Sequence, residues 1–257
     1  MDEKQNVQKQ FGRNADAYVT STIHAKGKDL QQLLALAELT GNENALDAAT
    51  GTGHTANAFA PYVSRMTAFD LTPEMLAAAK KFINGNGHAN VSFVQGDAEH
   101  MPFADDEFDI VTCRIAPHHF PNVERFLSEV SRVLKKNGQF LLDDNTAPED
   151  DEIDQFYNTI EKKRDGSHHR AWKKSEWIGM LERHGFEIDE ARRYTKTFAF
   201  DDWCGRMQLP GAEKEALNDF ILHAPENIRK KLRVKIKESQ VVSFLAESWL
   251  VKAIRRF

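Results

Sequence analysis

Short apolar runs alternate with helix-like segments along most of the chain. Segments such as PEMLAAAKKFI and VERFLSEVSRVLKK stand between apolar runs at 45–49, 66–69, 91–94, 108–115 and 139–142. Strand, helix and strand repeated in this order predict parallel strands joined by right-handed crossovers. The alternation therefore predicts an α/β fold.

Local signals mark where these elements begin and end. Thr72 and Pro73 place a capping residue and a helix-opening proline before one helix. The motif KKNG predicts that another helix ends near Gly138, because basic residues and then glycine are typical of helix C-termini.

Two regions break the alternation. Residues 1–43 contain a helical pattern around KDLQQLLALAEL but no strand, so we expect a helical preface that covers part of the sheet. Residues 147–172 form a polar, charged excursion after the fifth strand. An insertion there would overhang the carboxyl ends of the strands, where open α/β sheets bind ligands.

The C-terminal third continues the fold without adding chemistry. We predict a sixth strand over 185–200, a short helix over 200–207, a helical segment over 214–238 and a final strand over 240–257. The basic run RKKLRVKIK is predicted to be a solvated helix face. Trp203 and Trp249 are expected to pack in the interior.

Composition narrows the class of protein. The 257 residues are 41% hydrophobic and carry a formal charge of −5, which favours a small-molecule partner over nucleic acid. The two cysteines, Cys113 and Cys204, fit neither a disulfide framework nor a metal-binding spacing. No apolar run reaches the roughly 18 residues of a membrane span. We expect a cytoplasmic protein without a metal site; its oligomeric state stays open.

The stretch LDAATGTGHTANAF, residues 46–59, follows the first predicted strand. Gly51, Gly53 and Ala56 match the G-x-G-x-x-G/A pattern of nucleotide-binding turns, and Asp70 ends the next strand where a ribose-binding carboxylate is expected. A nicotinamide-dependent oxidoreductase fits this pattern. The same small residues could also serve only a tight turn into a helix.

Carboxylates stand at the ends of three predicted strands. Asp47 lies within an apolar strand end and is costly to bury unless it meets a donor or a cation, so we expect it to face a polar ligand group. Asp70 could accept two ribose hydroxyls, and Asp97 with the Ala98 backbone could bind an adenine edge. Asp97 could instead be a turn carboxylate after glycine.

The ordered motifs LDAATGTG, AFDLTPEML, VQGDAEHMPF, FDIVTCRIAPHHFPN and EVSRVLKKNGQFLLDD resemble the class I S-adenosylmethionine-dependent methyltransferases. The resemblance is greatest to the small-molecule branch similar to the ubiquinone/menaquinone-biosynthesis methyltransferases. It implies a Rossmann-like, doubly wound sheet of about seven strands, mostly parallel, with an antiparallel last strand between the fifth and sixth. It also implies one domain over 1–257, divided into a helical cap (1–43), a cofactor-binding core (44–146), an insertion (147–172) and the rest of the sheet (173–257).

The resemblance also implies roles for single residues toward S-adenosylmethionine. Gly51 and Gly53 would let the backbone approach the methionine end, Asp47 would lie near its amino group, and Arg114 would line that side. Asp70 would hold the ribose, while Leu71, Asp97 and Ala98 would contact the adenine. The expected cofactor-binding set also includes Ala49, Thr52 and Tyr18. The N-terminal segment, which contains Arg13, Tyr18 and His24, would close over cofactor and substrate as a lid, although the stretch around these residues could instead be an amphipathic helix with solvated polar groups.

Ala49 departs from the family's pattern, which has a glycine at that position. If the residue adopts a positive φ, alanine costs about 1 kcal/mol, and its methyl group crowds the cofactor.

The family's reaction is an in-line displacement that depends chiefly on aligning the reacting atoms. A hydroxyl acceptor benefits from a general base, whereas a stabilised carbanion or a neutral amine can do without one. His118 and His119 follow the fourth strand and are the candidate catalytic residues, although both could simply pack there. The cluster of His168, His169, Arg170 and Trp172 could bind an anionic substrate, but we favour a solvated loop. A cofactor-binding regulator without catalysis is a further alternative.

Overall fold

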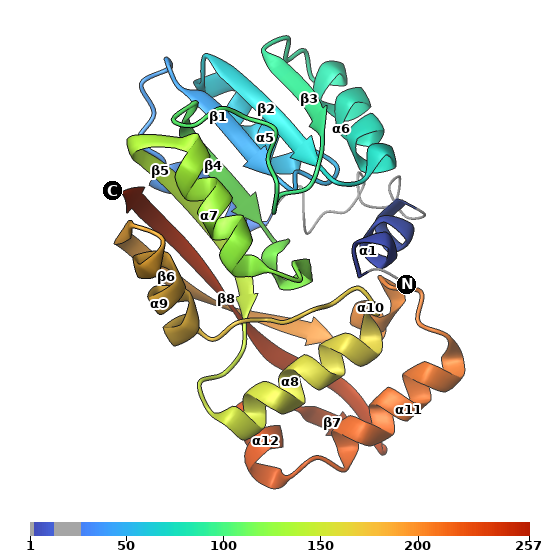
Figure 1. Cartoon of the computed structure of the whole chain (residues 1–257). Helices are drawn as coiled ribbons and strands as arrows, with labels where there is room; N and C mark the ends of the chain where they lie inside the picture. The colour runs from blue at the N-terminus through green and yellow to red at the C-terminus, as the bar shows by residue number, and fades with distance from the viewer. Residues whose placement is uncertain (1–2, 13–26) are drawn as a thin grey trace.

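The computed structural model describes residues 3–12 and 27–257, and Figure 1 shows a central sheet with helices around it. The strands are β1 (Asn44–Ala48), β2 (Arg65–Asp70), β3 (Val91–Gln95), β4 (Phe108–Arg114), β5 (Leu134–Thr146), β6 (Phe186–Ala199), β7 (Lys235–Lys237) and β8 (Gln240–Arg255). Their order is β3-β2-β1-β4-β5-β8-β6, and β7 pairs with β8. β1 to β5 are parallel, and β8 runs antiparallel between β5 and β6 as predicted.

Helices cover both faces of the sheet. Within the described ranges they are α1 (Glu3–Gly12), α4 (Lys28–Leu36), α5 (His54–Phe59), α6 (Pro73–Gly85), α7 (Val123–Val133), α8 (Asp151–Arg164), α9 (Lys174–Arg183), α10 (Phe200–Gly205), α11 (Gly211–Leu222) and α12 (Glu226–Lys231), with short 3-10 turns η1 (Ala60–Tyr62) and η2 (Pro117–His119). α4, α5 and α6 share one apolar cluster with the sheet, and α7 and α9 share another. Adjacent residues of β4 show the division, since Val111 packs in the cluster of α7 and α9 while Ile110 packs in that of α4 to α6. A strand buried on both faces requires a continuous apolar run, as the sequence has.

A third apolar cluster, the C-terminal cluster, lies beyond the parallel strands, where α8, α10, α11 and α12 pack against the first half of β8 (Figure 1). Trp203 is fully buried in this cluster, and Trp249 is buried in the cluster of α7 and α9, so both tryptophans pack as predicted. The excursion at 147–172 therefore includes a helix with a buried side.

Two predicted helices differ from the structure. The segment 214–238 is divided into α11, α12 and strand β7, so the basic run is not a continuous helix face. α7 ends at Val133, and the motif KKNG lies within β5. A Cβ at Gly138 would come within 2.8 Å of the Lys135 carbonyl oxygen, so the glycine serves a close backbone approach in the strand and does not end the helix.

The N-terminal preface has two described helices with different roles. α4 places Leu33 and Leu36 in the core against the sheet, whereas α1 lies near the carboxyl ends of the parallel strands. The predicted lid residues Arg13, Tyr18 and His24 lie outside the described residues. In the described part of the chain, no helix is long and apolar enough to span a membrane.

Candidate active site

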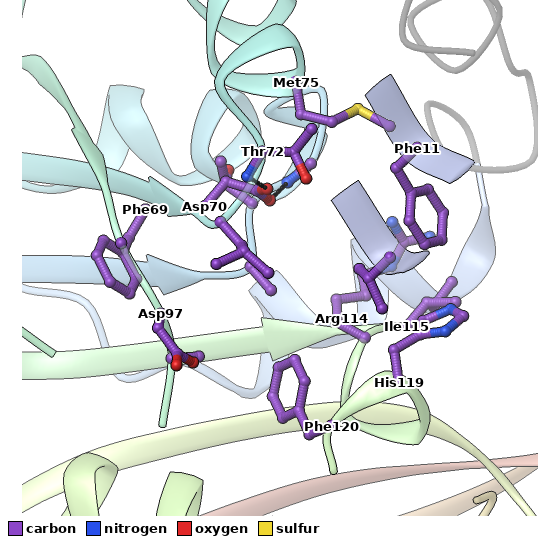
Figure 2. Close-up of a pocket in the computed structure, with 18 of the residues that line it drawn as sticks. Phe11, Phe69, Asp70, Thr72, Met75, Asp97, Arg114, Ile115, His119 and Phe120 are labelled. Carbon is purple, nitrogen blue, oxygen red and sulfur yellow. Dashed lines mark hydrogen bonds between the residues drawn. The ribbon is translucent and has the colours of Figure 1, made fainter. Parts of the chain in front are cut away.

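A cavity of about 150 Å³ opens at the carboxyl ends of the parallel strands. It lies where the chain passes outward from β1 to β2 and β3 and then returns to β4, which is the switch point that favours ligand binding. Of the residues predicted to bind the cofactor or to catalyse, those in the wall are Ala49, Gly51, Thr52, Asp70, Leu71, Asp97, Ala98, Arg114 and His119. Figure 2 labels Asp70, Asp97, Arg114 and His119 among them. Asp47, Gly53 and His118 are not in this wall.

Asp70 ends β2 and is held by backbone donors. Its Oδ2 accepts the Gly51 N–H at 2.7 Å, and its Oδ1 accepts the Thr72 N–H at 2.8 Å (Figure 2). Burial raises the pKa of this carboxyl above its ordinary value, although the backbone donors oppose that shift. Each oxygen of a carboxylate has two lone pairs, so Asp70 retains acceptor capacity toward the cavity.

Asp47 is buried and turned inward, which corrects the expectation that it faces a ligand. It accepts hydrogen bonds from the Thr50 hydroxyl at 2.6 Å, the Thr112 hydroxyl at 2.7 Å and the Ala56 N–H at 3.1 Å. Burial raises its pKa to about 6 despite these donors. Asp47 thus ties the turn after β1 to β4 and to the start of α5.

The turn after β1 uses its small residues in different ways. Ala49 has φ 58°, in the left-handed region where glycine is favoured. A Cβ added at Gly51 would meet no protein atom within 4 Å, whereas one at Gly53 would lie 2.8 Å from Ile83 Cδ1. Gly51 therefore keeps the cavity wall open. Gly53 instead allows α5 to pack closely on α6 and is not in the cavity wall.

Asp97 is both a wall residue and a turn carboxylate. Its Oδ1 accepts the Glu99 N–H at 2.9 Å, and its Oδ2 pairs with the Lys4 ammonium at 2.6 Å. Lys4 also pairs with Glu99 at 2.5 Å, and the Gln8 side chain donates to the Leu71 carbonyl oxygen at 3.0 Å. α1 is thus fastened across the mouth of the cavity by polar contacts.

Arg114 ends β4 within a buried charged group. Its guanidinium donates to Asp29 Oδ2 at 2.7 and 3.1 Å and lies 3.6 Å from Asp143 Oδ2. The Lys196 ammonium lies 3.9 Å from the same Asp29 oxygen. Burial raises the pKa of Asp143 to about 7, while the two cations limit that rise.

A second cavity, of about 100 Å³, adjoins the first. Phe11, Ile115 and His119 belong to both walls. The remaining wall residues come from η2, β5, α8 and the residue after it, β6, and α10 and the residues after it: His118, Asn145, Glu161, Arg164, Asp165, Lys196, Phe198, Trp203, Arg206 and Met207. The C-terminal cluster thus builds a chamber next to the cavity at the strand ends.

The two candidate catalytic histidines meet this chamber differently. His118 is buried and its Nδ1 lies 2.5 Å from Asp144 Oδ1. His119 lies edge-on to Phe11, with ring centroids 5.0 Å apart, and its Nδ1 is 3.0 Å from the Ser167 carbonyl oxygen. Burial and the charge of His118 lower the pKa of His119 to about 4, so its ring is neutral at pH 7.

The residues at 168–172 form a solvated loop only in part, because His169 is exposed while His168 and Ala171 are buried. His168 is 2% exposed and its Nε2 lies 2.9 Å from Asn158 Oδ1. Arg170 pairs with Asp154 at 2.9 Å and with Glu176 at 3.1 Å, and it lies over the Trp172 ring. None of the four predicted residues is in the wall of either cavity, so the structure does not bring them to the site.

Several residues of the two cavity walls were not predicted from the sequence. Lys4 and Phe11 reach the site from α1, and Arg164 and Arg206 reach it from the C-terminal cluster; a linear pattern does not mark such residues. Asp143 and Asp144 could have been found, because they stand near the end of a predicted parallel strand as Asp70 and Asp97 do.

Comparisons with known proteins agree with this geometry. A family described as a methyltransferase domain matches residues 46–142. The chain is 37% identical to a protein named uncharacterized methyltransferase YcgJ of Bacillus subtilis (strain 168), over 96% of this chain and 98% of that protein. The chain belongs to the S-adenosylmethionine-dependent methyltransferases.

Two further methyltransferases are similar to this chain. A crystal structure from Bacillus halodurans, described as a candidate methyltransferase, is 55% identical, has a TM-score of 0.88 and spans 90% of this chain and 100% of that one. The ubiquinone/menaquinone biosynthesis C-methyltransferase of Nitrobacter hamburgensis is 31% identical over 61% of this chain and 62% of that protein. The family decides against a nicotinamide-dependent oxidoreductase and confirms S-adenosylmethionine as the cofactor.

Proposed function

We propose that this methyltransferase transfers a methyl group to a small organic acceptor bound in the second cavity. The observation that carries the proposal is that the two cavities meet at Phe11, Ile115 and His119. A donor in the first cavity and an acceptor in the second would come together at that junction. The modest volume and the aromatic walls of the second cavity suit a small molecule.

The first cavity offers groups that fit S-adenosylmethionine. Asp70 has acceptor capacity for ribose hydroxyls, Gly51 leaves room beside the turn, and Leu71 and Ala98 offer apolar contacts to the adenine. When bound, S-adenosylmethionine supplies a methyl group activated by its sulfonium. The chain's own task is then to hold donor and acceptor in line and to exclude water.

A cytoplasmic location forms part of the proposal. Cys113 and Cys204 are free and buried, which suits a reducing compartment. The net charge of −5 gives no general attraction to nucleic acid.

Calorimetry and a labelled-methyl screen test the proposed function. S-Adenosylhomocysteine, the demethylated product, should bind while NAD gives no heat of binding. Incubation with labelled S-adenosylmethionine and a metabolite extract should move label into compounds that pass a small-pore filter. Label found only in protein or nucleic acid, or cofactor binding without any transfer, would refute a small-molecule acceptor.

A further inference from the structure

Asp144, near the end of β5, contacts both the ring and the backbone of His118. Its Oδ1 is 2.5 Å from His118 Nδ1, and its Oδ2 accepts the His118 backbone N–H at 2.9 Å. The Asn145 N–H donates to Oδ1 at 2.9 Å, and Asp144 is 1% exposed. An ionised carboxylate only accepts, so Nδ1 carries a proton, and in the neutral form of the ring the lone pair lies on Nε2.

The Nε2 atom of His118 is available to the second cavity. His118 is in the wall of that cavity, and among residues 3–12 and 27–257 its Nε2 has no hydrogen-bond partner. The rings of His118 and His119 lie 4.2 Å apart between centroids, and His119 belongs to both cavity walls. A proton acceptor therefore lies beside the junction where donor and acceptor would meet.

We propose that His118 is the general base of methyl transfer, that Asp144 positions it, and that the acceptor is a hydroxyl compound of the phenol or enol class. This inference rests on the proposed function. The acceptor O–H proton passes to Nε2, and an oxygen electron pair forms the new bond to the methyl carbon. The carbon–sulfur bond breaks with its electron pair remaining on sulfur, so the sulfonium becomes a neutral thioether and the histidine becomes an imidazolium.

The charges around His118 make it a stronger base. Burial lowers the pKa of His118, but the Asp144 carboxylate outweighs it, with help from Glu161 and Asp165, and the pKa is raised overall. Only the neutral ring can accept a proton, so methyl transfer should increase as pH rises through this raised pKa. His168 lies 5.6 Å from the His118 ring, and burial holds its pKa well below the ordinary value. His119 has its pKa lowered to about 4, first by burial and then by His118, which makes it the weaker base of the pair.

The charges in the wall of the second cavity favour an oxyanion over an ammonium group. Lys196, Arg164 and Arg206 are in this wall and outnumber its two carboxylates, Glu161 and Asp165, which lie 2.9 and 4.0 Å from Arg164. Arg164 also lies over the Trp203 ring, and Arg206 over the Phe198 ring, so cations line the aromatic faces. These cations stabilise negative charge that develops on a hydroxyl oxygen and disfavour a protonated amine. A neutral amine, moreover, has no need of a base to attack.

A spectroscopic probe tests the base directly. 4-Nitrophenol absorbs differently as phenol and as phenolate, so its spectrum reports where the proton is. With saturating S-adenosylhomocysteine, the wild-type protein should bind it as phenolate at a pH where the free probe is largely protonated. His118→Gln should lower the bound phenolate at least tenfold, and Asp144→Asn should lower it in the same direction. The exposed His223 provides the matched control, since His223→Gln should leave the spectrum unchanged.

Two further measurements avoid dependence on a variant that fails to fold. Ring-nitrogen NMR of the wild-type protein should show Nδ1 protonated in the neutral His118 ring; a proton on Nε2 instead would overturn the inference. Absence of 4-nitrophenol binding to the wild-type protein, or equal ionisation of bound 4-nitrophenol in wild type and His118→Gln, would also overturn the inference. In the labelled-methyl screen, label in amines or carbon acids and not in hydroxyl compounds would refute this inference while leaving the small-molecule function standing.

Discussion

At the residue scale, Asp70 couples the turn after β1 to the expected ribose site. Asp70→Ala should weaken S-adenosylhomocysteine binding by roughly 1.5–3 kcal/mol, the range for hydrogen bonds to a charged group. Because Asp70 also accepts the Gly51 and Thr72 N–H groups, some stability without ligand should be lost as well. Calorimetry and urea unfolding separate the two effects. Asp70→Asn, which keeps one acceptor oxygen, should lie between wild type and alanine; wild-type affinity in Asp70→Ala would remove the assignment.

Ala49 has a left-handed backbone conformation, in which a side chain lowers the free energy of unfolding. Its φ of 58° means that Ala49→Gly should raise the free energy of unfolding by about 1 kcal/mol. Urea unfolding measures this change. The neighbouring Ala48→Gly, in β1, is the matched control and should lower stability instead, because glycine weakens a strand interior. Destabilisation by both variants would show that Ala49 is unstrained.

The buried carboxyl group of Asp143 should make the free energy of unfolding depend on pH. Its pKa is raised to about 7 and that of Asp47 to about 6, in each case chiefly by burial. Between roughly pH 4 and 7 the folded protein therefore binds more protons than the unfolded chain, so stability falls as pH rises through these values. Asp143→Asn should reduce that fall. Urea unfolding at pH 5 and pH 8 measures it, and an equal fall in wild type and variant would contradict the assignment.

At the scale of elements, α1 is the part of the predicted lid that the structure describes. Its contacts with Asp97, Glu99 and Leu71 cross the mouth of the first cavity. S-Adenosylhomocysteine should therefore slow hydrogen exchange in Glu3–Gly12, because a bound ligand supports the closed helix. Lys4→Ala should speed that exchange in the free protein, whereas Lys9→Ala, at an exposed position of the same helix, should not. Unchanged exchange on ligand binding would leave α1 as ordinary packing.

At the scale of the whole molecule, the two cavities depend on different parts of the chain. The first is built by the strand ends and α1, and the second largely by the C-terminal cluster. Trp203→Ala should therefore lower stability by about 3–5 kcal/mol while leaving S-adenosylhomocysteine affinity within about twofold. Thermal unfolding and calorimetry check the two parts. Phe257→Ala, at a 90% exposed position, serves as the control, and a large loss of cofactor affinity in Trp203→Ala would show that the parts are coupled.

The sheet and the wall of the first cavity could largely be predicted from the sequence. Apolar runs, the glycine turn and the carboxylate Asp70 are local signals, since each depends on residues close together along one strand and its following turn. Parallel strands deliver their carboxyl ends to one edge, so Asp70, Asp97 and Arg114 could be expected there, and all three are in one cavity wall.

Which of these groups line a cavity depends on the tertiary structure. Asp47 and Asp70 look alike in the sequence, but Thr112 and the start of α5 turn Asp47 inward. The second cavity joins residues from α1, η2, β5, α8 and the C-terminal cluster, so no spacing along the chain marks it. The His118–Asp144 pair shows the physical reason: a buried contact between residues 26 apart depends on the register of β4 and β5, which is set by packing across the whole sheet.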